Sequence, residues 1–228
     1  MEKSSDIICD SSSLISLADS CLLPALKTIK DHLDGKILIS PRVEYESITH
    51  PLEIREYSLA ALRLKQALAE GTLTLLQNGK AKAATIEIMR HANSVYSIGK
   101  QKLQIIQDGE AEMLALAHEM GVQNVLMDER TTRMLAESPD DLHKHFEKEF
   151  GKSVNVDGDE LEWFAKLTRG MSIFRSSEIV VAAYELGYFK NYRGMERQML
   201  EASLYALKFA GCGISFEEIE GFLKAKRV

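Results

Sequence analysis

The sequence predicts an α/β protein: a parallel β-sheet flanked by helices on both faces, with extra helices. Three observations lead to this fold class. Short apolar segments that are typical of buried strands alternate with longer helical patterns along the chain. Strands alternating with helices are typical of parallel sheets. The 228 residues are 45% hydrophobic and 27% charged, which fits a globular chain with a sizeable core.

The first half of the chain contains three predicted strands with helices after each of the first two. The strands are 6–10 (DIICD), 35–41 (GKILISP) and 72–76 (TLTLL). A helix is expected over 13–33, with Pro24 marking a break or a second helix start. Further helices are expected over about 42–50 and 52–70, and Gly71 ends the last of them.

The second half contains two more predicted strands among longer helices. Residues 80–106 lean toward helix, 108–121 form a strong helix, 124–128 (NVLMD) form the fourth strand, and a helix over 129–138 stops at Pro139. Residues 140–170 are charged and mostly helical, around a small extended piece at 153–157. Residues 171–174 (MSIF) form the fifth strand, Ser176 or Ser177 caps the next helix, and 195–228 form two helices separated by GCGIS.

We expect one domain over residues 1–228, because the chain shows no internal repeat, low-complexity segment or clear linker. The charged stretch over about 138–170 is interpreted as a helical insertion. Residues 176–228 are interpreted as C-terminal helices.

Composition excludes several classes of protein. No apolar stretch approaches the ~20 residues of a membrane span, and the N-terminal MEKSSDII lacks the regions of a secretory signal, so a cytoplasmic location away from membranes is expected. Cys9, Cys21 and Cys212 are odd in number and widely spaced, which supports neither disulfides nor a thiolate zinc site. The net charge of −6 disfavours a generic polyanion binder, but it leaves room for a basic strip beside an acidic metal site.

Four acidic residues are expected at one edge of the sheet. Asp10 and Asp128 end the first and fourth strands, and ligands of open parallel sheets bind at the carboxyl ends of the strands. Glu46 follows the second strand on an inward-facing side of a short helix, and Glu110 opens a helix whose dipole favours an anion. An isolated carboxylate facing a core is costly, so each should be paired, protonated or bound to a cation. A site of oxygen ligands without His or Cys suits Mg²⁺ or Mn²⁺.

Three of the four acids also have a structural interpretation, and Glu46 is the hardest to explain in this way. Asp10 and Asp128 could be ordinary helix caps, and Glu110 a first-turn acid that the helix dipole favours. Convergence of four acids on one edge favours the metal site over these separate explanations. Glu112 lies about 200° around the helix from Glu110, so both cannot point inward.

Four segments resemble the motifs of the PIN-domain family. IICDSSSLISLADSCLL resembles its first motif and ISPRVEYES its second, with Glu46 in the acidic position. GEAEMLALAHEMG followed by VLMDERTTR resembles the third and fourth, placing Glu110 and Asp128. The third acid is Glu where the family more often has Asp, and the chain is longer than a minimal toxin. The tail from FRSSEIVVAAYELGYF to GISFEEIEGFLK is similar to the C-terminal helices of an archaeal and bacterial subgroup.

The resemblance implies a Mg²⁺- or Mn²⁺-dependent ribonuclease fold, often the toxin of a toxin–antitoxin pair. Its substrate would be RNA, and an antitoxin, another protein or a second copy of the chain would be its protein partner. In this hypothesis Asp10, Glu46, Glu110 and Asp128 are the metal ligands and catalytic residues, and they hold one or two ions. Ser12 and Ser176 support the ligands, and Arg130, Arg133 and Arg175 contact phosphates through guanidinium groups.

Three alternatives remain open. The same fold could be catalytically inert and serve RNA or protein recognition. A phosphatase of the haloacid-dehalogenase type also has an Asp after its first strand, but Ser12 occupies the position where that family needs a second Asp. The C-terminal helices could also make the chain a protein-interaction scaffold, which is compatible with enzymatic activity.

Overall fold

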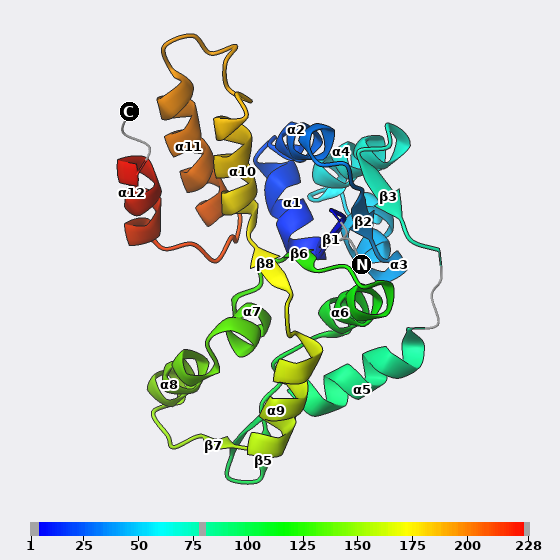
Figure 1. Ribbon diagram of the computed structural model, residues 1–228, viewed down its shortest axis with the longest axis vertical. Coiled ribbons are helices and arrows are strands. Elements are labelled where there is room, and N and C mark those ends of the chain that lie inside the picture. The colour runs from blue at the N-terminus through cyan, green and yellow to red at the C-terminus, as the bar shows by residue number, and fades with distance from the viewer. Residues whose placement is uncertain (1–4, 78–80, 226–228) are drawn as a thin grey trace.

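A five-stranded parallel sheet lies at the centre of the structure, a computed structural model that describes residues 5–77 and 81–225 (Figure 1). Its strand order is β3-β2-β1-β6-β8. The strands are β1 (Ile7–Cys9), β2 (Ile37–Ile39), β3 (Leu73–Leu75), β6 (Asn124–Leu126) and β8 (Ser172–Phe174). All five predicted strands are present and all pairs are parallel, so the predicted fold class is confirmed. The predicted features at 1–4, 78–80 and 226–228 lie outside the described residues.

Helices cover both faces of this sheet because successive strand residues point to opposite sides. Ile7 and Cys9 face one core, which is built with α1 (Ser11–Asp19), α2 (Leu23–His32), α4 (Ser58–Ala69), α10 (Ser176–Glu185), α11 (Glu196–Phe209) and α12 (Phe216–Ala225). Ile8 faces the other core, which is built with α5 (Lys82–Ala92), α6 (Asp108–Met120), α7 (Arg130–Glu137), α8 (Pro139–Phe150) and α9 (Gly158–Leu167). The carboxyl ends of β1 and β6, where Asp10 and Asp128 stand, lie between these two layers.

The helix expected over 42–50 has a different local form. It starts as α3 (Pro41–Glu44), continues as a π-helical turn over Tyr45–Thr49 and is followed by a 3₁₀ turn over Pro51–Glu53. Glu46 lies in the π-helical turn, a form that often occurs at functional sites. The helix expected over 13–33 is divided into α1 and α2, with Pro24 in the first turn of α2.

A second, antiparallel sheet was not predicted. Its strands are β4 (Tyr96–Ile98), β5 (Gln101–Lys102) and β7 (Asn155–Val156), in the order β5-β4-β7. A two-residue turn with Gly99 at φ 60° joins β4 to β5, and turns with positive φ suit hairpins. The expectation that residues 80–106 lean toward helix is confirmed over Lys82–Ala92 and is wrong beyond it, while the extended piece expected at 153–157 is present as β7.

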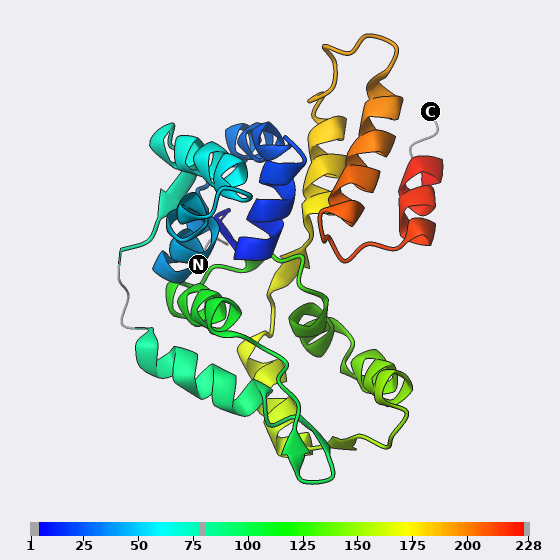
Figure 2. The same ribbon diagram turned by 180° about the vertical axis from the view of Figure 1, so that it is seen from behind.

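The remaining elements form two groups on either side of the sheet (Figures 1 and 2). The helices α5, α8 and α9 lie with the small sheet at one end of the molecule, and α10, α11 and α12 lie side by side near the other. The loop between α11 and α12 runs back toward β8 (Figure 1). Within the described ranges, none of the helices is long and apolar enough to span a bilayer.

Candidate active site

Asp10 and Asp128 lie beside each other at the carboxyl ends of adjacent strands. β1 pairs with β6 in parallel register, and the Asp10 amide donates to the carbonyl of Leu126 at 2.9 Å. Both aspartates are only 2% exposed. Two buried carboxylates this close are unfavourable without a compensating positive charge or proton.

Serine donors hold the Asp10 carboxylate in place. Its Oδ1 accepts from the Ser13 amide at 2.9 Å and contacts the Ser13 hydroxyl, and its Oδ2 accepts from the Ser12 hydroxyl at 2.5 Å. Asp10 is thus the N-cap of α1 as well as a buried acid. Burial raises the pKa of Asp10 to about 7, the negative charge of Asp128 adds to that rise, and the serine hydrogen bonds oppose it.

Asp128 is held from the opposite side by the start of α10. Its Oδ1 accepts from the Ser176 amide at 2.7 Å and its Oδ2 from the Ser176 hydroxyl at 2.6 Å. The turn from β8 into α10 therefore orients this carboxylate. Each oxygen still has a lone pair for another partner, because carboxylate oxygens accept more than one bond.

Glu46 reaches the same edge from the π-helical turn. Its Oε2 accepts from the Ser11 hydroxyl at 3.1 Å, and its Oε1 pairs with Arg42 Nε at 2.7 Å. Gly109 leaves room for it, since a Cβ there would stand 2.7 Å from Glu46 Oε2. Glu46 thus connects the start of α1, through Ser11, with the first turn of α6.

Glu110 lies in the first turn of α6, half-buried. Its Oε2 accepts from the Gln107 amide at 2.8 Å and forms part of a capping box. Burial raises the pKa of Glu110, and the negative charges of Glu129 and Glu46 raise it further. Glu129 itself caps α7 through the amides of Thr131 and Thr132, and Glu112 turns away to accept from the Arg42 amide at 2.9 Å.

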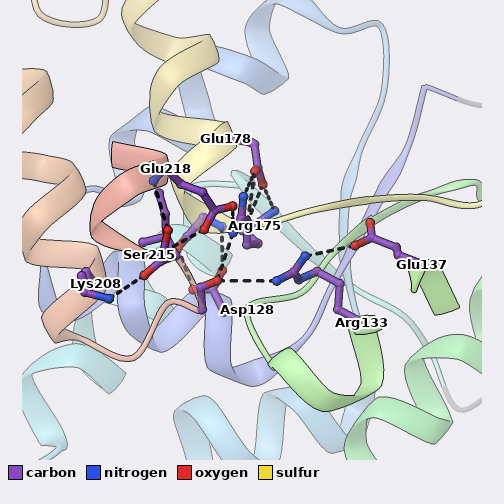
Figure 3. Close-up of polar contacts among 11 residues, drawn as sticks. Asp128, Arg133, Glu137, Arg175, Glu178, Lys208, Ser215 and Glu218 are labelled. Atoms are coloured by element: carbon purple, nitrogen blue, oxygen red, sulfur yellow. Dashed lines mark hydrogen bonds and ion pairs between the residues drawn. The ribbon is translucent and has the colours of Figure 1, made fainter. Parts of the chain in front are cut away.

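The three predicted phosphate-binding arginines have different surroundings, two of which are drawn in Figure 3. Arg130 is exposed, at the start of α7. Arg133 pairs with Glu137 at 3.0 Å. Arg175 is 6% exposed and is bonded to Glu178, to Glu218 at 2.9 Å and to the carbonyl of Gly213 at 3.0 Å, so its donors are taken within the protein. Those carboxylates keep the pKa of Arg175 above its ordinary value against the opposing effect of burial.

Several residues that shape the site were missed in the sequence. Arg42 stands four residues before Glu46, a helical spacing that could have indicated the ion pair. Ser11 and Ser13 flank the predicted Ser12, and capping preferences could have indicated Ser13. Gly109 carried no signal, because its role depends on the approach of Glu46 from a distant segment.

The donor chemistry of the edge fits a hard divalent cation. Its acids are carboxylates supported by hydroxyl and amide donors, and oxygen ligands of this kind suit Mg²⁺ or Mn²⁺. Burial is the main cause of the raised pKa of Asp10, the charge of Asp128 adds to it, and a cation at this edge would counter both effects. Over the parts of the chain that the structure describes, no three His, Cys, Asp or Glu side chains are already gathered closely enough to hold an ion.

A family model described as a PIN domain matches residues 6–140, more than half of the chain. The chain belongs to the PIN-domain family. The resemblance seen in the sequence is therefore confirmed, and the fold is of the nuclease type. PIN domains are generally nucleases and typically use divalent metals. No curated protein matches the chain significantly. The matched region of this PIN-domain protein contains all four acids but ends before Ser176 and the C-terminal helices.

Proposed function

We propose that this PIN-domain protein is a ribonuclease that depends on Mg²⁺ or Mn²⁺ and hydrolyses phosphodiester bonds of RNA. The observation that carries the proposal is the pair of buried aspartates, Asp10 and Asp128, held side by side by serine donors. Asp10 also caps α1, but capping alone does not require a second buried acid beside it. A bound cation would offset the cost of burying the charge of Asp10, which is the main cause of its raised pKa, and the smaller repulsion from Asp128.

The residues of the edge would divide the work as follows. Asp10 and Asp128 would be the central ligands, with Glu46 from the π-helical turn and Glu110 from α6 completing the acidic set. Ser12 and Ser176 would fix the orientation of the two aspartates, since the partners of a ligand control its geometry.

The arginines beside the acidic edge would balance the charge of the acids and bind the phosphates of the RNA. Arg42 neutralises Glu46 in the metal-free protein and would release it when a cation binds. Arg130 would contact a phosphate, and Arg133 and Arg175 would add positive potential beside Asp128. A bound Mg²⁺ or Mn²⁺ would supply Lewis-acid stabilisation of the phosphoryl oxygens and lower the pKa of a water molecule.

The proposal includes the setting of the enzyme. It would act in the cytoplasm as one domain over residues 1–228, with a helical insertion over about 138–170 and C-terminal helices over 176–228. Its protein partner would be an antitoxin, another protein or a second copy of the chain.

Cleavage assays with matched variants test this function. Wild type, Asp10→Asn and Asp128→Asn are incubated with a mixture of labelled RNAs in Mn²⁺, Mg²⁺ or EDTA, after circular dichroism has shown that each is folded. Glu201→Gln, an exposed change on α11, is the control. We expect cleavage that needs metal, is lost in both aspartate variants and persists in the control. RNA or protein binding without cleavage, unaffected by Asp10→Asn, would favour an inert PIN-fold binding module.

A further inference from the structure

A cleft of about 450 Å³ lies beside the acidic edge, between α7 and the loop that joins α11 to α12. Its lining includes Arg130, Arg133, Lys208 and Glu218. The cleft adjoins Asp128 directly: a Cβ on Gly213, another lining residue, would stand 3.1 Å from the Asp128 carbonyl and 3.6 Å from Arg130 Cβ. Figure 3 shows Lys208, Glu218 and Arg133 around Asp128.

The cleft is positively charged although the whole chain carries −6. Its single acid, Glu218, is bound by Arg175 at 2.9 Å and by the Ser215 amide at 2.7 Å. Arg133 is paired with Glu137, whereas Arg130 has no ion-pair or hydrogen-bond partner within the described ranges. A local excess of basic side chains attracts phosphate.

Aromatic rings lie at the outer side of the same loop. Phe209 ends α11 and is 78% exposed, and Phe216 begins α12 and is 47% exposed. Their ring centroids are 6.4 Å apart, and the half-buried Tyr205 lies 6.0 Å from Phe216. Exposed aromatic rings beside a basic groove are how proteins bind single-stranded nucleic acid, because every base can stack on a ring.

Lys208 joins the basic cleft to the aromatic surface. It lines the cleft, its Nζ stands 4.3 Å from the centre of the Phe216 ring, and it donates to the Ile214 carbonyl at 2.6 Å. The cation occupies one face of the Phe216 ring, so a base would stack on the opposite face. Basic and aromatic side chains thus stand next to one another, as the phosphate and the base of one nucleotide do.

We propose that the α11–α12 loop forms a nucleotide-binding subsite for single-stranded RNA, outside the region that matches the PIN-domain family. Arg130 and Lys208 would bind a phosphate that flanks the scissile bond, and Phe209 and Phe216 would stack its base. The inference rests on the proposed function, because the cleft would receive the part of an RNA strand that is next to the bond cleaved at the acidic edge. The positive charge of the cleft beside the aromatic surface favours a polyanion such as RNA over a protein.

Binding assays in EDTA separate this subsite from catalysis. The probe is a labelled single-stranded oligouridylate of about twelve nucleotides, with a duplex of the same length for comparison, measured by fluorescence anisotropy over a range of salt concentrations. The variants are Phe209→Leu, Phe209→Tyr and Arg130→Gln. Met120→Ala, which truncates a 46% exposed side chain at the far end of α6, is the control.

We expect Phe209→Leu to weaken binding of the single strand about fivefold or more, because it loses a stacked base. Phe209→Tyr keeps the ring and should bind like wild type, as should the control. Arg130→Gln should lower the slope of log K against log salt by about 0.7, the value for one phosphate contact on a single strand.

Other outcomes overturn the subsite. Failure of wild type to bind, equal affinity of Phe209→Leu and wild type, or preference for the duplex would each do so. A change in self-association with Phe209→Leu, seen by sedimentation without a change in RNA affinity, would assign the aromatic surface to a second copy. RNA binding that depends on Phe209, without any cleavage, would overturn the proposed nuclease and support the subsite. Cleavage and binding that are both unchanged in Phe209→Leu would support the nuclease and overturn the subsite.

Discussion

Replacing Asp10 by Asn should stabilise the metal-free protein at about pH 8. The pKa of Asp10 is raised from its ordinary value of 3.8 to about 7 in the folded chain, a difference of about three units. At ~1.36 kcal/mol per unit, ionising this buried carboxyl costs the folded state up to about 4 kcal/mol. Asn keeps the shape and the capping oxygen but carries no charge, so the variant avoids this cost.

The sign of the effect defines its pH dependence. Between about pH 4 and pH 7 the folded wild type keeps a proton that the unfolded chain releases, so the wild-type free energy of unfolding falls as pH rises through this range. Above about pH 7 the loss stays constant. The two proteins should therefore be similar near pH 4 and differ most above pH 7, where Tm would differ by up to about 8–16 °C at ~2–4 °C per kcal/mol.

Thermal unfolding followed by circular dichroism over this pH range, with and without Mn²⁺, measures the effect. Mn²⁺ at a hundred times its Kd should add about 2.7 kcal/mol to the free energy of unfolding of wild type and so raise its Tm. The Tm of Asp10→Asn should not change. Glu201→Gln should follow wild type throughout. Parallel pH profiles for wild type and Asp10→Asn, or a variant that is less stable at about pH 8, would refute the reasoning.

Three further changes probe the supports of the site and the fold. Ser176→Ala removes the hydroxyl bonded to Asp128 and should weaken Mn²⁺ binding about 10- to 100-fold by calorimetry, whereas Ser177→Ala should not. Gly109→Ala places a Cβ 2.7 Å from Glu46 Oε2, so kcat/KM for RNA should fall at least about tenfold with helicity retained. Gly158→Ala is the control, because a Cβ there meets nothing within 4 Å. Unchanged kinetics in both variants would contradict a role of Glu46 at the site. Tyr96→Phe loses a 2.8 Å bond to the Pro139 carbonyl and should lower the free energy of unfolding by about 1 kcal/mol in urea titrations.

The main sheet could be predicted because its strands have the strongest local signal. The sheet is covered on both faces, so Ile7, Ile8 and Ile37 are all buried although neighbouring side chains point to opposite sides. Each strand is therefore a continuous apolar segment that ends at turn residues. The small sheet lacks that signal. Gln101 and Lys102 are both exposed and β5 pairs with β4 over two residues only, so no alternation of polar and apolar residues marks this strand.

In the candidate site, too, the features that depend on local sequence could be predicted and those that depend on distant segments could not. Asp10 and Asp128 could be placed at one edge because each follows a strand within two residues, and position after a strand is a local property. The close approach of Glu46 to Gly109 could not be predicted, since it depends on packing between segments more than 60 residues apart.

Arg175 shows why residue type alone does not define a phosphate ligand. It ends the fifth strand beside Asp128, as a phosphate-binding arginine would, but it is buried and bonded to Glu178, Glu218 and the Gly213 carbonyl. Glu218 stands far along the chain on α12, so no spacing rule predicts this bond. Because Ser176 follows Arg175 and holds Asp128, the ion pair with Glu218 ties the last helix to the acidic edge. The C-terminal helices, which lie outside the family match, thus help to fix the geometry of an acid within it.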